Sequence, residues 1–140
     1  MQLVVDANIL LAGFSKSATT RELLLDPRLQ LFAPEHLLIE TIRHVEHNTS
    51  LKKRIGLASP EIRFVFEQLT CRIQTSPLDE YSARMADGIR LAAHPEDAPY
   101  LALALWKRLP LWSNDKGMKL QSDVKVFTTA QLIAALSARS

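Results

Sequence analysis

Short apolar runs with the period of a β-strand alternate along this chain with longer stretches of helical period. The short runs predict strands at Gln2–Val5, Leu29–Phe32, Cys71–Thr75, Pro110–Trp112 and Val124–Phe127. The stretches between them predict helices at Asn8–Phe14, Thr20–Leu25, from Glu35, from Ser59, and at Asp79–Leu91, Asp97–Trp106 and Thr128–Leu136. Strands that alternate with helices are typical of a parallel sheet covered by helices on both faces, so we expect an α/β fold.

Three of the predicted helices carry further signals. The helix Asp97–Trp106 is apolar nearly all round, which predicts that it is buried. Ser59-Pro60-Glu61 resembles a helix start, with Ser59 as the N-cap and Pro60 at the first helical position. Thr128 or Thr129 is the expected N-cap of the last helix.

The size and composition of the chain fit one soluble domain. Its 140 residues, 47% of them hydrophobic, predict a single domain over residues 1–140. Cys71 is its one cysteine and lies in an apolar stretch, so we interpret it as a small core residue in a reducing compartment. No apolar run has the roughly 18 residues of a membrane helix, and the N-terminus has no basic segment of a signal peptide, so we expect a cytoplasmic protein without membrane contact.

The formal net charge of +2 is too small to indicate a nucleic-acid partner by itself. Such a role has to come from a site, and acidic residues are the candidates. Asp6 and Asp115 each follow a predicted strand, and sites in parallel sheets form at the carboxyl ends of the strands. Asp97 opens the buried helix, and Glu40 lies on the polar face of the helix that begins at Glu35.

Each of these acids also has an ordinary structural interpretation. Asp6 and Asp115 fit turns or helix caps, Asp97 fits a helix start, and Glu40 fits a solvated helix position. If the four carboxylates do meet, their charges raise one another's pKa and destabilise the fold. A hard divalent cation such as Mg²⁺ or Mn²⁺ is the usual compensation, because it prefers oxygen ligands and serves phosphoryl chemistry.

The segments VVDANIL, EDAPYLALAL and LWSNDKG, together with the helix that carries Glu40, resemble the PIN-domain family. This resemblance covers nearly the whole chain. The family includes the VapC-like toxins of toxin–antitoxin pairs. It implies a three-layer α/β/α sandwich with a parallel sheet of four or five strands, and an RNA endonuclease that uses one or two Mg²⁺ or Mn²⁺ ions. Asp6, Glu40, Asp97 and Asp115 match the four acidic residues of the family, while Asn8 and Ser113 match polar residues that support the site. The resemblance also implies a small antitoxin partner and a homodimer.

The resulting hypothesis is a metal-dependent ribonuclease. Asp6, Asp97 and Asp115 bind the metal, Glu40 assists through a second ion or a bound water, and metal-bound water attacks the RNA phosphodiester in line. Four cations are candidates for contacts with the RNA backbone: Arg21, Arg43, Lys116 and Lys119.

Two alternatives stay open. A phosphatase of the haloacid dehalogenase type also begins with a strand-ending Asp, but it needs a second acid where this chain has Asn8. A regulatory or RNA-binding protein would keep the acidic pocket without cleaving RNA. We interpret His36, His44 and His47 as part of a solvated helix face.

Overall fold

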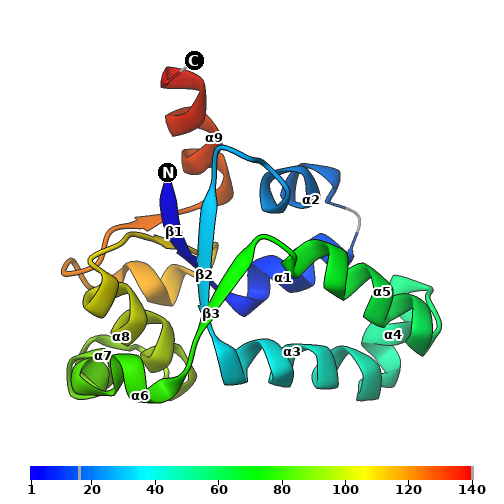
Figure 1. The fold of residues 1–140 in the computed structure, drawn as a ribbon, viewed down its shortest axis with the longest axis horizontal. Helices are drawn as coiled ribbons and strands as arrows, with labels where there is room; N and C mark the ends of the chain where they lie inside the picture. Colours follow the sequence, from blue (N-terminus) through cyan, green and yellow to red (C-terminus); the bar gives the residue numbers. More distant parts are fainter. Residues whose placement is uncertain (16, 140) are drawn as a thin grey trace.

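Five parallel strands form the centre of the computed structural model, which describes residues 1–15 and 17–139 (Figure 1). The strand order is β3-β2-β1-β4-β5, and Leu3 lies opposite Leu31 while Val4 lies opposite Leu111. The strands are β1 (Gln2–Val5), β2 (Gln30–Pro34), β3 (Ile73–Ser76), β4 (Leu111–Trp112) and β5 (Val126–Phe127). The predicted parallel sheet is therefore confirmed, with five strands.

Helices cover both faces of this sheet and complete the predicted three-layer sandwich (Figure 1). One face is covered by α1 (Ala7–Phe14), α2 (Ala18–Leu24), α3 (Glu35–His47), α5 (Ser59–Thr70) and α9 (Thr129–Ala138). The other face is covered by α6 (Leu78–Tyr81), α7 (Met85–Leu91) and α8 (Ala98–Lys107). No helix within residues 1–15 and 17–139 combines the length and the apolar character needed to cross a membrane.

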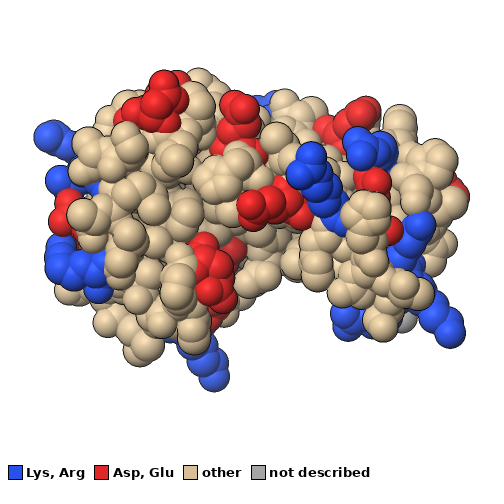
Figure 2. Space-filling model, turned by 90° about the horizontal axis from the view of Figure 1, so that it is seen from below, with Lys and Arg blue, Asp and Glu red and all other residues tan. Residues whose placement is uncertain are grey.

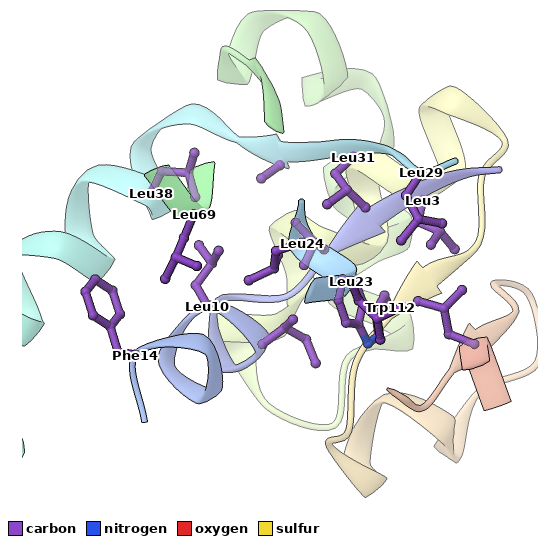
Figure 3. Packing of buried hydrophobic residues seen from close by; sticks show 14 of the residues in the cluster. Leu3, Leu10, Phe14, Leu23, Leu24, Leu29, Leu31, Leu38, Leu69 and Trp112 are labelled. Carbon is purple, nitrogen blue, oxygen red and sulfur yellow. The ribbon is translucent and has the colours of Figure 1, made fainter. Parts of the chain in front are cut away.

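The alternating side chains of β1 explain why the sheet has two apolar faces. Leu3 and Val5 join the cluster that contains Leu10 of α1 and Leu24 of α2 (Figure 3). Val4 points the other way, into the cluster built around α8. Every residue from Tyr100 to Ala104 in α8 is buried, as its apolar sequence predicts. This burial fixes the start of α8, and with it Asp97, against the sheet.

Several local predictions are wrong. The predicted helix Asp79–Leu91 is broken into α6, a 3₁₀ turn at Ser82–Arg84 and α7. Ser59 is the first residue of α5 rather than its N-cap, which is Ala58; the Glu61 carboxylate accepts a hydrogen bond from the Ala58 N–H at 3.3 Å. A further helix, α4 (Thr49–Ile55), was not predicted, because its sequence TSLKKRI buries no side chain fully.

The prediction that Cys71 is a core residue is also wrong, because its side chain is exposed. Cys71 is the C-cap of α5, where the chain turns toward β3. Leu69, two residues earlier, takes the buried position and is 3% exposed. An apolar stretch at the end of a helix therefore does not bury each of its members. Thr128, in contrast, is the N-cap of α9 and accepts from the N–H of Gln131, as predicted.

Candidate functional site

Asp6 lies at the carboxyl end of β1 and serves as the N-cap of α1. Its Oδ1 accepts from the N–H of Asn8 at 3.2 Å, which is the capping role that its sequence position allows. Its Oδ2 accepts from the hydroxyl of Ser113 at 2.6 Å, across 107 residues of sequence. With 3% of its surface exposed, Asp6 is a buried carboxylate held on two sides.

Asp115 follows β4, which lies beside β1 in the sheet. Its Oδ1 accepts from the N–H of Gly117 at 2.9 Å and caps the 3₁₀ turn Lys116–Leu120. Its own N–H donates to the Ser113 Oγ at 3.1 Å. The fully buried Ser113 hydroxyl therefore connects Asp6 to the backbone of Asp115 and fixes the two strand ends relative to each other.

Asp97 ends a 3₁₀ turn, Pro95–Asp97, immediately before α8. It stands at the N-cap of α8, so the predicted helix start is confirmed, but its side chain makes no capping hydrogen bond. Its side chain is buried, and Oδ2 has no hydrogen-bond partner among the described residues. A buried carboxylate oxygen without a partner is costly, which indicates a site whose ligand satisfies it.

Tyr100 is a site residue that the sequence analysis missed. It lies one helical turn after Asp97, is 5% exposed, and its hydroxyl oxygen accepts from the N–H of Ala7 at 3.2 Å. This contact ties the start of α8 to the start of α1. The spacing of three residues from Asp97 is the signal that could have found it, because residues three apart share one face of a helix.

These residues open onto a cleft of about 520 Å³ between α1, α3 and the start of α8. Figure 2 looks toward the carboxyl ends of the strands and shows several Asp and Glu side chains bordering the hollow, with most Lys and Arg toward the two ends of this face. Helix α3 supplies Glu40, Thr41 and His44, so His44, interpreted from sequence as solvated, is exposed and borders the cleft. Asn8 also lines the cleft. Asp115 is not among the lining residues and is connected to Asp6 through the Ser113 hydroxyl.

Burial and mutual repulsion change the acidity of this group. Burial raises the pKa of Asp6 above its ordinary value, against the lowering effect of the Ser113 hydrogen bond. The pKa of Asp97 is raised to about 6, first by burial and then by the negative charges of Asp115 and Asp6. Burial also raises the pKa of the Tyr100 hydroxyl, which stays protonated beside these carboxylates. The three aspartates therefore interact electrostatically, and each negative charge makes the next less favourable.

The oxygen atoms at this site fit a hard divalent cation, which prefers carboxylate oxygens as ligands. Asp97 Oδ2, which has no hydrogen-bond partner among the described residues, is available as one such ligand. Within residues 1–15 and 17–139, no three His, Cys, Asp or Glu side chains lie close enough together, as placed, to hold one ion. This does not conflict with Mg²⁺, which keeps several waters and commonly uses one or two carboxylates. Asp97 and Asp6 are the residues best placed to hold such an ion.

The four candidate cations for RNA contacts lie outside the residues that line the cleft. Arg21 donates to the carbonyl oxygens of Gly13 and Ser15, at 3.3 Å and 2.6 Å, and so caps the end of α1. Lys119 donates to Gln131 at 2.6 Å. Arg43 is exposed on α3 beside His44, and Lys116 is exposed beside Asp115, so these two are nearest to the acidic residues along the chain.

We expect Asp97→Asn to stabilise the metal-free protein increasingly as the pH rises from about 4 to about 6. The folded state holds the Asp97 proton up to a pKa of about 6, whereas the unfolded chain releases it near 3.8, so the aspartate lowers the free energy of unfolding across this window. Urea unfolding with EDTA at about pH 4 and about pH 7 measures the difference between the two proteins. An equal difference at both pH values would contradict the raised pKa.

Comparisons with known proteins agree with this fold. The model of the PIN domain family matches residues 4–137. None of the curated proteins matches the chain. Among solved structures, a chain of the VapBC2 complex from Rickettsia felis, bound to a DNA fragment from its promoter, is similar with a TM-score of 0.66. The match covers 91% of this chain and 98% of that chain at 13% sequence identity, a level at which the likeness concerns the fold.

Proposed function

The chain belongs to the PIN domain family, whose members are generally nucleases, and from this premise we propose that it is an endoribonuclease that depends on Mg²⁺ or Mn²⁺. One observation carries the proposal. The unpartnered, buried Oδ2 of Asp97 lies at the same sheet edge as Asp6 and Asp115, which Ser113 joins. An arrangement that places repelling carboxylates together and leaves one buried oxygen unsatisfied is expected where a cation completes the site.

Each residue has a role in this proposal. In this proposal Asp6 and Asp97 bind the cation directly, Asp115 contributes its negative charge from the neighbouring strand end, and Glu40 acts across the cleft from α3. The Ser113 hydroxyl orients Asp6, and Asn8 supports the site from the first turn of α1. When bound, the divalent ion supplies charge neutralisation at the phosphate and activation of water. Tyr100, protonated and fixed on Ala7, keeps the cleft wall in place.

The fold shared with a chain of the VapBC2 complex supports a more specific proposal. We propose that this protein is the toxin of a type II toxin–antitoxin pair, that it acts on cytoplasmic RNA, and that a small antitoxin restrains it. A homodimer is part of the same proposal. Affinity capture of the tagged protein from its native host, followed by size-exclusion chromatography with light scattering, tests both associations; a monomer that captures no small protein would contradict them.

The cleavage activity itself is tested with purified protein and a labelled single-stranded RNA. We expect cleavage with Mn²⁺ or Mg²⁺, none with EDTA, and recovery when excess Mn²⁺ is returned, because the carboxylates need the cation to approach a phosphate. Asp115→Asn, prepared in parallel, is expected to lose cleavage and so excludes a contaminating nuclease. Cleavage that survives both EDTA and Asp115→Asn would contradict the proposal.

A second role, binding of RNA without cleavage, has a distinct outcome in the same experiment. In that case no RNA is cut, yet Mn²⁺ still raises the melting temperature, since a ligand that binds only the folded state stabilises it. The comparison of cleavage with thermal stabilisation therefore separates an enzyme from a binding protein that keeps the acidic cleft.

A further inference from the structure

A second large hollow lies at the amino ends of the strands, at the opposite edge of the sheet from the acidic cleft. It has a volume of about 770 Å³ and is lined by the starts of β1 and β4, by the segment before β5 and by the end of α8. Both chain termini lie at this end of the molecule (Figure 1). A smaller hollow of about 280 Å³ shares Met1 and Arg139 with it. We call the two together the amino-end groove.

The amino-end groove is basic. Four cations from different elements line the larger hollow, with Asp123 as its one acid: Arg84, Arg108, Lys125 and Arg139. Asp123 is itself 3.8 Å from Arg90. Within the described part of the chain, no carboxylate lies at ion-pairing distance from Arg108, Lys125 or Arg139. These three positive charges are thus available to an anionic partner.

The backbone conformation of Arg108 is an independent indication that its side chain has a functional role. Arg108 is the C-cap of α8, with φ 58° and ψ 47°. Among the described residues it is the only one other than glycine with a positive φ. Glycine is the favoured residue in this left-handed conformation, because a Cβ is strained there. Gly56 takes the corresponding position at the end of α4. At the end of α8 the chain instead places a guanidinium at the rim of the groove.

The spread and the chemistry of these charges favour a polymer over a single small anion. The cations belong to four separate elements, and the groove continues past Arg139 to Arg28. Phe127 also lines it, with the Lys125 ammonium 4.8 Å from the centre of its ring. Unpaired cations beside an aromatic side chain are typical of surfaces that bind single-stranded nucleic acid, where phosphates meet the cations and a base meets the ring.

We propose that the amino-end groove binds the phosphate backbone of single-stranded RNA, at a site separate from the acidic cleft. The identity of the ligand rests on the proposed ribonuclease function, whereas the anion-binding property rests on the groove alone. An RNA held in both places would follow the side of the domain from one edge of the sheet to the other. The groove then adds affinity for long RNAs without taking part in the chemistry.

The test is fluorescence anisotropy with a labelled oligouridylate of about 20 nucleotides, in EDTA so that no cleavage can contribute. Arg108→Gly and Lys125→Glu are the variants. Each lost phosphate contact is expected to weaken binding about fivefold at 0.1 M salt and to reduce the salt slope by about 0.7. The double variant is therefore expected to bind about 25-fold more weakly, with a slope lower by about 1.4.

Two controls keep this result specific. Arg108→Gly relieves the left-handed strain, so its melting temperature is expected to equal or exceed that of the unaltered protein, and weaker binding cannot come from unfolding. Lys53→Glu makes the same charge change as Lys125→Glu on an exposed position of α4, and binding is expected to stay within about twofold.

Three results would overturn the inference. They are a double variant that retains the affinity and salt slope of the unaltered protein, a Lys53→Glu variant that weakens binding as much as Lys125→Glu, and polyglutamate of similar length that competes as well as unlabelled RNA. The last result would identify an acidic polypeptide as the partner. Because the assay needs no catalysis, groove-dependent binding by a protein that cuts no RNA contradicts only the ribonuclease proposal.

Discussion

Replacing Asp97 by Asn is expected to lower metal-dependent RNA cleavage by about 100- to 1,000-fold while the protein stays folded. Asn keeps the size of the side chain but removes the negative charge that holds the cation. The fold should tolerate the change, because Asp97 Oδ2 has no hydrogen-bond partner among the described residues, and Asp6 and Asp115 repel the Asp97 carboxylate. Single-turnover cleavage with saturating Mn²⁺, beside a urea unfolding curve, measures both effects.

Asp87→Asn is the matched control for this substitution. Asp87 lies on α7, partly exposed, and pairs with Arg84 at 3.4 Å and Arg90 at 3.5 Å. Surface pairs of this kind contribute little, so both stability and cleavage should stay close to those of the unaltered protein. If Asp97→Asn cleaves as fast as Asp87→Asn, the cation is not held by Asp97 and the proposed site is wrong.

Gly88→Ala is expected to destabilise the protein by about 2–3 kcal/mol, or more if the helices cannot separate. Gly88 lies in α7 where it packs against α8, and a Cβ there would come within 2.5 Å of the Ala98 carbonyl oxygen and 3.1 Å of the Ala102 Cβ. The backbone of α8 must shift to accommodate the methyl group. Because Ala98 directly follows Asp97, cleavage should fall as well. The midpoint of urea unfolding and the cleavage rate are the two measurements.

Gly13→Ala in α1 distinguishes a backbone collision from the general effect of adding a methyl group. A Cβ at Gly13 meets only side-chain ends, Leu24 Cδ1 at 3.0 Å and Leu69 Cδ1 at 3.3 Å, which can rotate away. The higher helix propensity of alanine, worth about 1 kcal/mol, offsets part of that cost. Gly13→Ala should therefore stay within about 1 kcal/mol of the unaltered protein. Equal losses for the two variants would mean that the α7–α8 contact is not specially tight.

The fold class followed from the sequence because hydrophobic period is a local property. The strand Gln2–Val5 was predicted with the bounds that it has, and the buried helix after Asp97 and the cap at Thr128 were also found. The errors occur where tertiary context overrides a local pattern. The apparent helix Asp79–Leu91 is interrupted by a 3₁₀ turn, and Cys71 is exposed because the chain reverses there.

The candidate site was only partly accessible from sequence. Asp6 and Asp115 could be selected because each ends an apolar run, and Asp97 and Glu40 were candidates from their positions on predicted helices. The resemblance to the PIN domain supported these four and added Asn8 and Ser113. Whether these residues act in catalysis stays a prediction. Tyr100 was passed over because its apolar neighbours in α8 made it look like one more core residue. The amino-end groove was also invisible, since its cations are scattered from Arg84 to Arg139.

The sequence by itself determined most of the segments that form strands and helices, and that acidic residues follow two of the strands, because these features depend on near neighbours in the chain. Only the tertiary structure decided that β1 and β4 lie side by side. That adjacency brings the Ser113 hydroxyl to 2.6 Å from Asp6, across 107 residues. Strand order is set by how two apolar faces pack against helices, and this cooperative choice is not written in any single segment.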